Sequence, residues 1–119
     1  MIARHWTGRV RPEDVDAYVE YVRKTGVATQ RATAGNLGSM VSVRRGDIDA
    51  EILVVSFWES LDAVHRFAGP DAETAVFYPE DGRFLVAADK TVTHYEIPLH
   101  ALDPSLIPPA PGRAGAGAA

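Results

Sequence analysis

The segment AEILVVSFW, residues 50–58, is the feature that most restricts how this chain can fold. In an extended strand its apolar side chains divide between two faces. One face carries Leu53, Val55 and Phe57, and the other carries Ile52, Val54 and Trp58. A strand that is apolar on both faces has to be covered on both sides. One small chain has helices enough to cover only one face of its sheet, so we expect the second face to meet another subunit.

The first half of the chain predicts a strand, a helix and a hairpin. Residues 1–9 alternate as a strand that places Arg4 and Trp6 on the same face. A helix follows from Pro12, which suits a first helical position, and we expect it to end near Gly26. The segment SMVSVRR then alternates as a second strand, and the Gly- and Asp-containing turn after it pairs it with residues 50–58.

The second half predicts another helix and a last strand. Ser60 is a good N-cap for a helix over residues 61–68, which Gly69-Pro70 ends. A second short helical piece is expected at residues 72–76. Residues 77–86, FYPEDGRFLV, read as a compact turn rich in aromatic groups, and KTVTHYEI closes the domain as a strand.

This order of elements is that of a ferredoxin-like fold of the α+β class, βαββαβ, with an antiparallel sheet and both helices on one face. We expect one domain over residues 1–97. Residues 98–119 are rich in Pro, Gly and Ala, and such an arm cannot build a packed core by itself. Apolar residues punctuate this arm at Leu99, Leu102, Leu106 and Ile107. We therefore expect the arm to lie across the partner subunit of a homodimer.

Composition excludes several classes of protein. The net charge of -4 argues against a nucleic-acid partner, because phosphate binding relies on clustered Lys and Arg. The absence of cysteine excludes disulfides, thiolate catalysis, iron–sulfur clusters and cysteine-ligated zinc. The N-terminus lacks a signal-peptide pattern, and no apolar run approaches the roughly 20 residues that span a bilayer. We expect a soluble cytoplasmic protein without a membrane partner.

Four segments together resemble the antibiotic biosynthesis monooxygenase family of dimeric α/β barrel proteins. They are FWES at the end of the third strand, LDAVHRFAG, FYPEDGRFLV and THYEI, and the resemblance covers residues 1–97. It implies a cofactor-independent monooxygenase, without flavin, haem or metal, that acts on a small aromatic or polyketide-like substrate such as an anthrone. In that chemistry the substrate loses a proton, its anion passes an electron to O2, and the recombined radical pair loses water. The alternatives are a non-oxidative small-molecule enzyme or binding protein, such as a cyclase or dehydratase, and a haem-binding or haem-degrading protein.

The resemblance and the residue chemistry together indicate four candidate catalytic residues. Trp58 matches the family's Trp at the end of the third strand, where it lines a cavity; the alternative is that it packs the core. The phenol of Tyr78 needs a hydrogen-bond partner if it is buried. His65 has an intrinsic pKa that suits a base, although an exposed position is commoner. Arg83 would stabilise an enolate if it turned inward, and otherwise forms a surface pair with a neighbouring carboxylate.

Aromatic and imidazole side chains complete the candidate set as substrate-binding residues. They are Trp6, Phe67, Phe77, His5 and His94. The two histidines could lie on neighbouring strands, but no spacing supplies further ligands, so we expect no metal site. Haem-degrading relatives combine an Asn on the first strand, a second Trp and an iron-ligating His. This chain has Phe67 and Phe77 near the last two positions, which argues against haem degradation.

Overall fold

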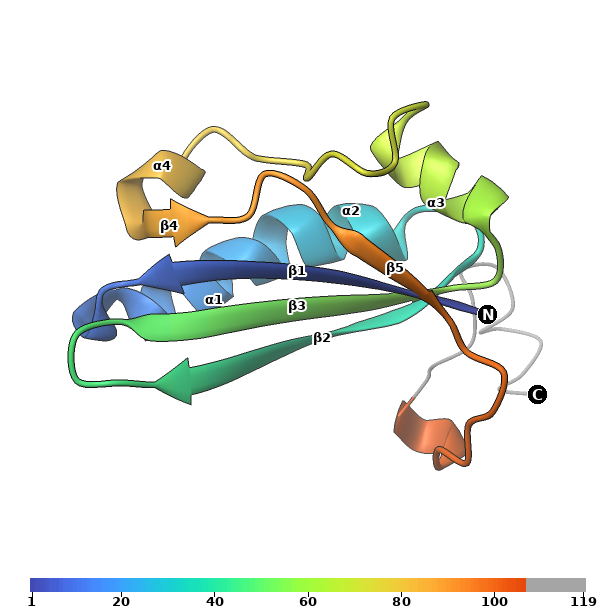
Figure 1. The fold of residues 1–119 in the computed structure, drawn as a ribbon, viewed down its shortest axis with the longest axis horizontal. Coiled ribbons are helices and arrows are strands. Elements are labelled where there is room, and N and C mark those ends of the chain that lie inside the picture. The colour runs from blue at the N-terminus through green and yellow to red at the C-terminus, as the bar shows by residue number, and fades with distance from the viewer. Residues whose placement is uncertain (107–119) are drawn as a thin grey trace.

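The computed structural model describes residues 1–106 as an antiparallel sheet with helices on one face (Figure 1). The strands are β1 (Ile2–Val10), β2 (Asn36–Arg45), β3 (Ala50–Trp58), β4 (Leu85–Ala88) and β5 (Thr93–Glu96). Their order is β2-β3-β1-β4, and β5 also pairs with β1. The predicted ferredoxin-like α+β architecture is therefore confirmed.

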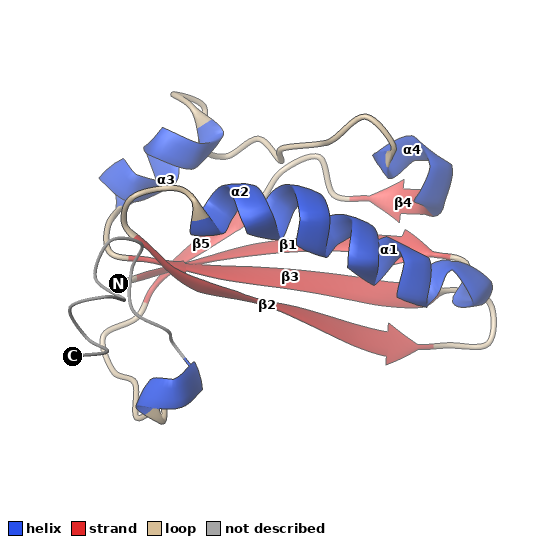
Figure 2. Ribbon diagram, turned by 180° about the vertical axis from the view of Figure 1, so that it is seen from behind, coloured by secondary structure: helices blue, strands red, loops and turns tan. Residues whose placement is uncertain are grey.

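The helices gather on one side of this sheet. They are α1 (Val15–Val22), α2 (Ala28–Arg31), α3 (Leu61–Ala68) and α4 (Asp81–Phe84), with a π-helical turn at Arg23–Val27 and a 3-10 turn at Pro12–Asp14. A further 3-10 turn, Pro104–Leu106, lies apart from them in the C-terminal arm. Figure 2 shows α1 and α2 running along the sheet as one continuous helical segment, with α3 near one end and α4 near the other. Within the described residues, no helix is both long and apolar enough to cross a membrane.

The first helical segment is longer than the sequence predicted. It does not stop near Gly26 but passes through the π-helical turn and continues to Arg31. Threonine hydroxyls support this continuation, because Thr25 donates to the carbonyl of Tyr21 and Thr29 donates to the carbonyl of Thr25, both at 2.8 Å. A glycine inside a helix costs only about 1 kcal/mol, which the packing of the segment against the sheet can offset.

The segment between α3 and β5 differs most from the prediction. Residues 72–76 form no helix; Thr74 makes a β-bridge with Thr91, and the N–H of Val92 donates to the carbonyl of Glu73 at 2.8 Å. The predicted aromatic turn contains α4 and β4. Two short strands thus fill the last strand position. Asp89 still donates its backbone N–H to Thr7 of β1, and residues 90–92 then leave the sheet to pair with residues 73–75.

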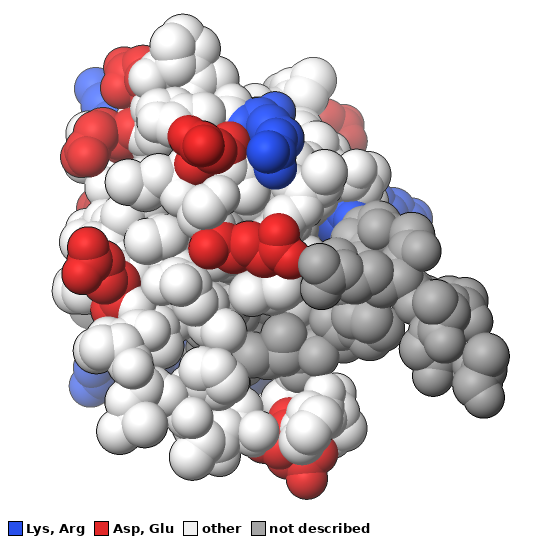
Figure 3. All heavy atoms as spheres, turned by 90° about the vertical axis from the view of Figure 1, so that its right-hand side faces the viewer, with Lys and Arg blue, Asp and Glu red and all other residues white. Residues whose placement is uncertain are grey.

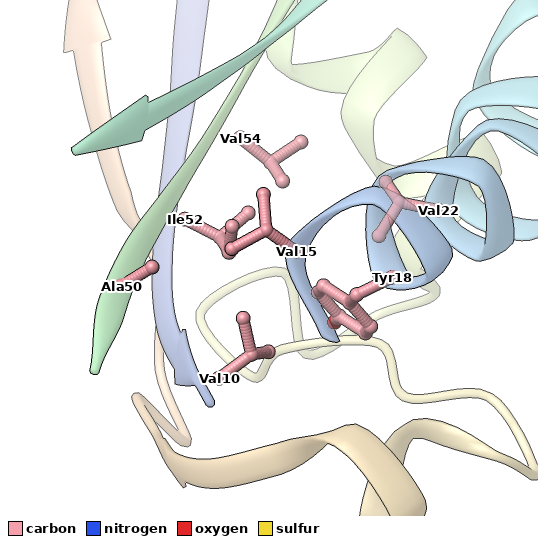
Figure 4. Packing of buried hydrophobic residues seen from close by; sticks show 7 residues of the cluster. All are labelled: Val10, Val15, Tyr18, Val22, Ala50, Ile52 and Val54. Carbon is pink, nitrogen blue, oxygen red and sulfur yellow. The ribbon is translucent and has the colours of Figure 1, made fainter. Parts of the chain in front are cut away.

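Buried apolar residues from β1, β3 and α1 form the larger core cluster, drawn in Figure 4. It comprises Val10, Val15, Tyr18, Val22, Ala50, Ile52 and Val54. A second cluster joins Trp58 to Ala63, Val64 and Ala72 beneath α3. The face of β3 that carries Ile52, Val54 and Trp58 is therefore the face covered by helices.

The opposite face of the sheet, which we call the outer face, carries the other apolar set of β3. Leu53 and Phe57 are half-buried there, and Val55 is paired with Met40 of β2, whose side chain is 50% exposed. Tyr95 of β5 lies beside Ala3 on the same face and is 54% exposed.

The beginning of the C-terminal arm is described as far as Leu106. Residues 98–106 are exposed, and Leu99 is 84% exposed. Figure 1 shows this segment projecting from the end of the sheet where β1 begins. Ile107 and residues 108–119 lie outside the described residues, so the expectation that the arm crosses a partner stays a prediction.

Gly8 makes room for the indole of Trp6 on the helix-covered face. A Cβ at Gly8 would lie 2.5 Å from the Cη2 atom of Trp6 and 2.9 Å from a Leu85 methyl carbon. We expect Gly8→Ala to lower the free energy of unfolding by about 1–3 kcal/mol, as overpacking does. Urea denaturation measures this change, and Gly82→Ala is the matched control because its added Cβ would meet nothing within 4 Å. Equal stability of the two variants would contradict the prediction.

Candidate functional site

A cavity of about 60 Å³ lies between the helix-covered face of the sheet and the segment 72–81. Its walls are mainly apolar and aromatic, with a few polar side chains among them. The lining residues are Arg4, Trp6, Tyr18, Val22, Thr25, Gly26, Gln30, Val54, Phe67, Ala75, Val76, Phe77, Tyr78, Asp81 and Val92. An apolar cavity with a few convergent polar groups is the usual form of a small-molecule site, although typical ligand pockets measure about 300–1,000 Å³.

An open hollow adjoins this cavity on the side of β4. Its volume is about 430 Å³, and it is lined by residues of β4, Gly82 and Lys90. Phe77, Tyr78 and Asp81 line both spaces, so the segment that they form is the partition between them. Phe77 is 45% exposed, and its ring meets that of Trp6 edge to face at 6.1 Å. The side chain of Phe77 is therefore the part of the partition that can move with the least loss of packing.

Arg4 of β1 is a buried cation in the wall of the cavity, only 4% exposed. Its Nη1 donates to the carbonyl of Ala72 at 2.5 Å, and its Nη2 donates to the carbonyl of Thr74 at 3.1 Å. Nη1 also lies 3.0 Å from Nε2 of His94. The guanidinium thus ties β1 to the segment that covers the cavity.

Arg4 has no carboxylate within ion-pair distance among residues 1–106. Burial lowers its pKa, whereas the charge of Glu73 acts in the opposite direction, and a guanidinium remains protonated in either case. A guanidinium has five N–H donors, and the three contacts above use only part of them. Because a buried charge without a counter-ion is costly, this wall of the cavity favours an anion or a strong hydrogen-bond acceptor.

His94 of β5 lies directly opposite Arg4 in the strand pairing. Burial and the positive charge of Arg4 lower the pKa of His94. The imidazole is therefore neutral at neutral pH and accepts the Arg4 N–H at Nε2. The proton of the neutral ring is then placed on Nδ1.

The lowered pKa of His94 predicts a loss of stability in mild acid. The unfolded chain, with the ordinary pKa of 6.5, binds a proton before the folded chain does, so this contribution is present above that pH and is lost as the pH falls below it. We expect His94→Gln, which keeps an acceptor for Arg4, to show a smaller fall in melting temperature than the wild type between about pH 7.5 and pH 5. Thermal melts across this range measure the difference, and parallel curves would contradict it.

Asp81 is a buried carboxylate at the other end of the cavity, 7% exposed at the start of α4. Tyr18 of α1 donates its hydroxyl to Oδ1 at 3.1 Å, and the backbone N–H of Tyr78 donates to Oδ2 at 2.6 Å. Burial, and then the charge of Asp81, raises the pKa of Tyr18 well above its ordinary value. Tyr18 therefore remains a neutral hydrogen-bond donor to Asp81.

Four of the predicted site residues line the cavity. They are Trp6, Phe67, Phe77 and Tyr78. Trp6 is held by a hydrogen bond from Nε1 to the carbonyl of Asp89 at 2.8 Å. Burial raises the pKa of the Tyr78 phenol, and a hydrogen bond with Thr29 acts in the opposite direction. His94 does not line the cavity, but it contacts Arg4, which does.

Trp58, the residue carried over from the family resemblance, lies behind the cavity wall. It is fully buried, stacks on Phe67 with a centroid separation of 5.6 Å, and donates Nε1–H to Ser56 Oγ at 2.8 Å. Its one donor is thus used within the core. The geometry corresponds to the core-packing alternative, and a direct catalytic role for Trp58 stays a prediction.

The remaining candidates lie away from the cavity. His65 is exposed, with Nδ1 2.9 Å from the carbonyl of Gly69 at the end of α3. Arg83 pairs with Glu80 at 2.9 Å on the surface, the commoner alternative for this residue. His5 is on the outer face and contacts Tyr95 edge to face at 5.0 Å, so it and His94 are on neighbouring strands but on opposite faces.

Sequence reasoning missed Arg4, Gln30 and Asp81 as site residues. Arg4 carried a signal, since a charged residue sat between Ile2 and Trp6 on one predicted face. Gln30 fell beyond the predicted end of the first helix, and it accepts a hydrogen bond from Ser39 at 2.6 Å. Asp81 had no distinguishing signal, because an Asp before Gly is typical of an exposed turn.

Haem does not fit the residues of this cavity. No histidine lines it among the described residues, and the nearby Nε2 of His94 is engaged by Arg4. No group of three or more potential metal ligands occurs in residues 1–106. The side of the molecule drawn in Figure 3 shows separate acidic side chains and few basic ones, unlike the clustered cations that bind phosphate backbones.

The sheet and its helical cover define an α+β protein of the ferredoxin-like class, and the cavity between them is its candidate small-molecule site. The family model described as "Antibiotic biosynthesis monooxygenase" matches residues 1–75, and the chain belongs to that family. A comparison with curated proteins finds no match.

Two solved structures share the fold at low sequence identity. A putative antibiotic biosynthesis monooxygenase from Bacillus cereus has a TM-score of 0.62 and 18% identity, covering 86% of this chain and 97% of its own. The haem-degrading protein MhuD from Mycobacterium tuberculosis, with two haems bound in its active site, has a TM-score of 0.53 and 17% identity, covering 85% of this chain and 99% of its own. At these identities the similarity shows the fold alone.

Proposed function

We propose that this protein is a cofactor-independent monooxygenase that uses O2 to oxidise a small aromatic substrate after the substrate has lost a proton. The observation that carries the proposal is the buried Arg4 guanidinium, which forms no ion pair with a described residue and lies in an aromatic-walled cavity of a family member. Anthrones and related polyketides have an acidic carbon, and their anions are electron-rich enough to reduce O2. A preorganised cation in a water-poor cavity stabilises such an anion most effectively.

The roles of the chain's residues follow from their positions. The rings of Trp6, Phe67 and Phe77 would hold a flat substrate by stacking and edge contacts. The free N–H groups of Arg4 would donate to the substrate oxygen that becomes negative. The anion then passes an electron to O2, and recombination followed by loss of water converts the CH2 group to a carbonyl. The apolar walls would keep bulk water away from the radical pair.

Substrate entry requires the partition to open. A tricyclic substrate needs more room than about 60 Å³, and the adjoining hollow of about 430 Å³ supplies it if Phe77 swings away from Trp6. In the proposed complex the substrate therefore extends through the cavity and the open hollow, and the end that loses the proton lies in the cavity.

Oxygen consumption with anthrone in chelated buffer tests this proposal. An enzyme of the proposed kind takes up one O2 for each quinone formed, above the buffer rate, and continues to do so with a strong metal chelator present. Turnover of a polyketide-like substrate without oxygen uptake would replace the oxygenase by the cyclase or dehydratase alternative. If a panel of anthrones undergoes neither reaction, the result contradicts both the oxygenase proposal and the cyclase or dehydratase alternative.

We also propose that two chains pack through their outer faces as a homodimer. The support is the outer face, where the half-buried Leu53 and Phe57 lie with the exposed Met40 and Tyr95, around the buried Val55. A group of exposed apolar side chains on one face often marks an interface. Light scattering at low micromolar concentration should give twice the mass of one chain, and Phe57→Asp should give the monomer. A monomeric wild type would overturn this proposal without affecting the cavity argument.

A further inference from the structure

The cavity has two buried side chains of opposite charge that are not paired with each other. Arg4 is at the end near α3, because it binds the carbonyls of Ala72 and Thr74. Asp81 is at the end near α4, held by Tyr18 and the Tyr78 N–H. No ion pair joins Arg4 to Asp81, and neither forms one with any other described residue.

This separation is the opposite of what stability alone favours. Each buried ion carries a desolvation cost that a partner of opposite charge would reduce. The chain forms ion pairs readily elsewhere, but these join exposed side chains, as in Arg83 with Glu80 and Arg9 with Asp49. The space between Arg4 and Asp81 is instead walled by Trp6 and Phe77. A cavity with a cation at one end and a carboxylate at the other suits a ligand that has an acceptor at one end and an acidic hydrogen at the other.

The hydrogen bonds of Asp81 leave it able to take a proton. Each carboxylate oxygen has about two acceptor directions, and only one donor reaches each. Both donors are neutral, so the carboxylate is oriented without being neutralised by a cation. Glu80, its neighbour in sequence, is exposed and paired with Arg83, and does not line the cavity.

We infer that Asp81 is the catalytic base of this site, and that the site binds a carbon acid whose acidic hydrogen faces Asp81 while its carbonyl oxygen faces Arg4. The inference rests on the proposed function for the identity of the carbon acid. The C–H bond breaks as its proton moves to a carboxylate oxygen of Asp81, and the electron pair stays on the substrate as an enolate whose oxygen faces Arg4. O2 adds to the carbanionic carbon as a peroxide anion, and the protonated Asp81 returns its proton to the outer peroxide oxygen. The same carbon then loses its second hydrogen as a proton while the O–O bond breaks, so that the carbonyl forms and the outer oxygen leaves with both hydrogens as water.

Proton exchange measured without oxygen tests Asp81 separately from oxygenation. Under argon in deuterated buffer, the wild type should speed the loss of the anthrone CH2 signal by proton NMR above the buffer rate. We expect Asp81→Asn to slow the protein-dependent exchange about 10²–10⁴-fold, the usual contribution of a positioned base. Glu80→Gln should exchange like the wild type, because this carboxylate is outside the cavity.

A second variant keeps the test decisive if Asp81→Asn fails to fold, which a thermal melt would show. Tyr18→Phe removes one donor to Asp81 but leaves the carboxylate and its Tyr78 bond, so exchange should persist. Loss of exchange in a folded Tyr18→Phe would show that the Asp81 carboxylate alone does not take the proton, and would overturn the inference. The inference would also be overturned if a folded Asp81→Asn exchanged as fast as the wild type, or if the wild type itself did not speed the exchange. Exchange that depends on Asp81 without any oxygen uptake would support the base and refute the oxygenase.

Discussion

Replacing Arg4 with Met should lower kcat/KM for the oxidation of an anthrone by about 10²–10³-fold, the range seen when one donor to a developing oxyanion is removed. The physical reason is that Met fills a similar volume but offers no charge and no N–H to the substrate oxygen. The fall should appear mainly in kcat, because the anion forms only after the substrate has bound. Steady-state oxygen uptake measures both constants.

The control variant for Arg4→Met is Arg83→Met, because the sequence indicated Arg83, and not Arg4, as a candidate catalytic residue. Arg83→Met removes a charge of the same kind from the surface, where the partner is Glu80, and should change kcat/KM by less than threefold or so. Arg4→Met also leaves the carbonyls of Ala72 and Thr74 without their donor, so its melting temperature must be measured beside its activity. A folded Arg4→Met with wild-type kcat would refute the role of Arg4 as anion stabiliser.

The second large effect is on stability. Trp58→Ala should lower the free energy of unfolding by about 3–5 kcal/mol, as expected for the truncation of a fully buried large aromatic. It removes the stack on Phe67 and leaves Ser56 Oγ without its indole donor. Chemical denaturation measures this loss, and Phe77→Ala is the control, because a 45% exposed ring should cost much less.

The outcome also decides between the two sequence interpretations of Trp58. A large loss of stability, with Trp58→Phe retaining most of the activity, would assign it to the core. A small loss of stability together with a large fall in turnover would restore the pocket-lining role that the family resemblance implied.

The sheet could be predicted because its signals are local. Period-two alternation and the doubly apolar β3 fix which residues face the helices and which face outward, once a helix is placed on one side. The end of the first helical segment could not be predicted, because the packing that carries it through Gly26 to Arg31 is tertiary. The departure of residues 90–92 from the sheet depends on backbone hydrogen bonds to residues 73–75, and no side-chain pattern encodes these bonds.

The candidate site was predictable only for its apolar part. Aromatic residues such as Trp6 and Phe77 stand out in a sequence because large rings are usually buried or bind ligands. A buried Arg or Asp looks like any surface charge until the fold shows what surrounds it. Arg4 and Asp81 are 77 positions apart in the sequence, and only the path of the covering segment brings them to one cavity.

The division of the last strand position into β4 and β5 also protects the protein from uncontrolled sheet extension. A continuous edge strand offers a row of free backbone groups that can template aggregation. Here that edge consists of two short pieces, Leu85–Ala88 and Thr93–Glu96, and the chain between them turns away from the sheet. At the other edge, β2 ends in Arg44 and Arg45, whose like charges repel a second copy in register. Both edges of the sheet are therefore poor templates for the backbone pairing that would extend it.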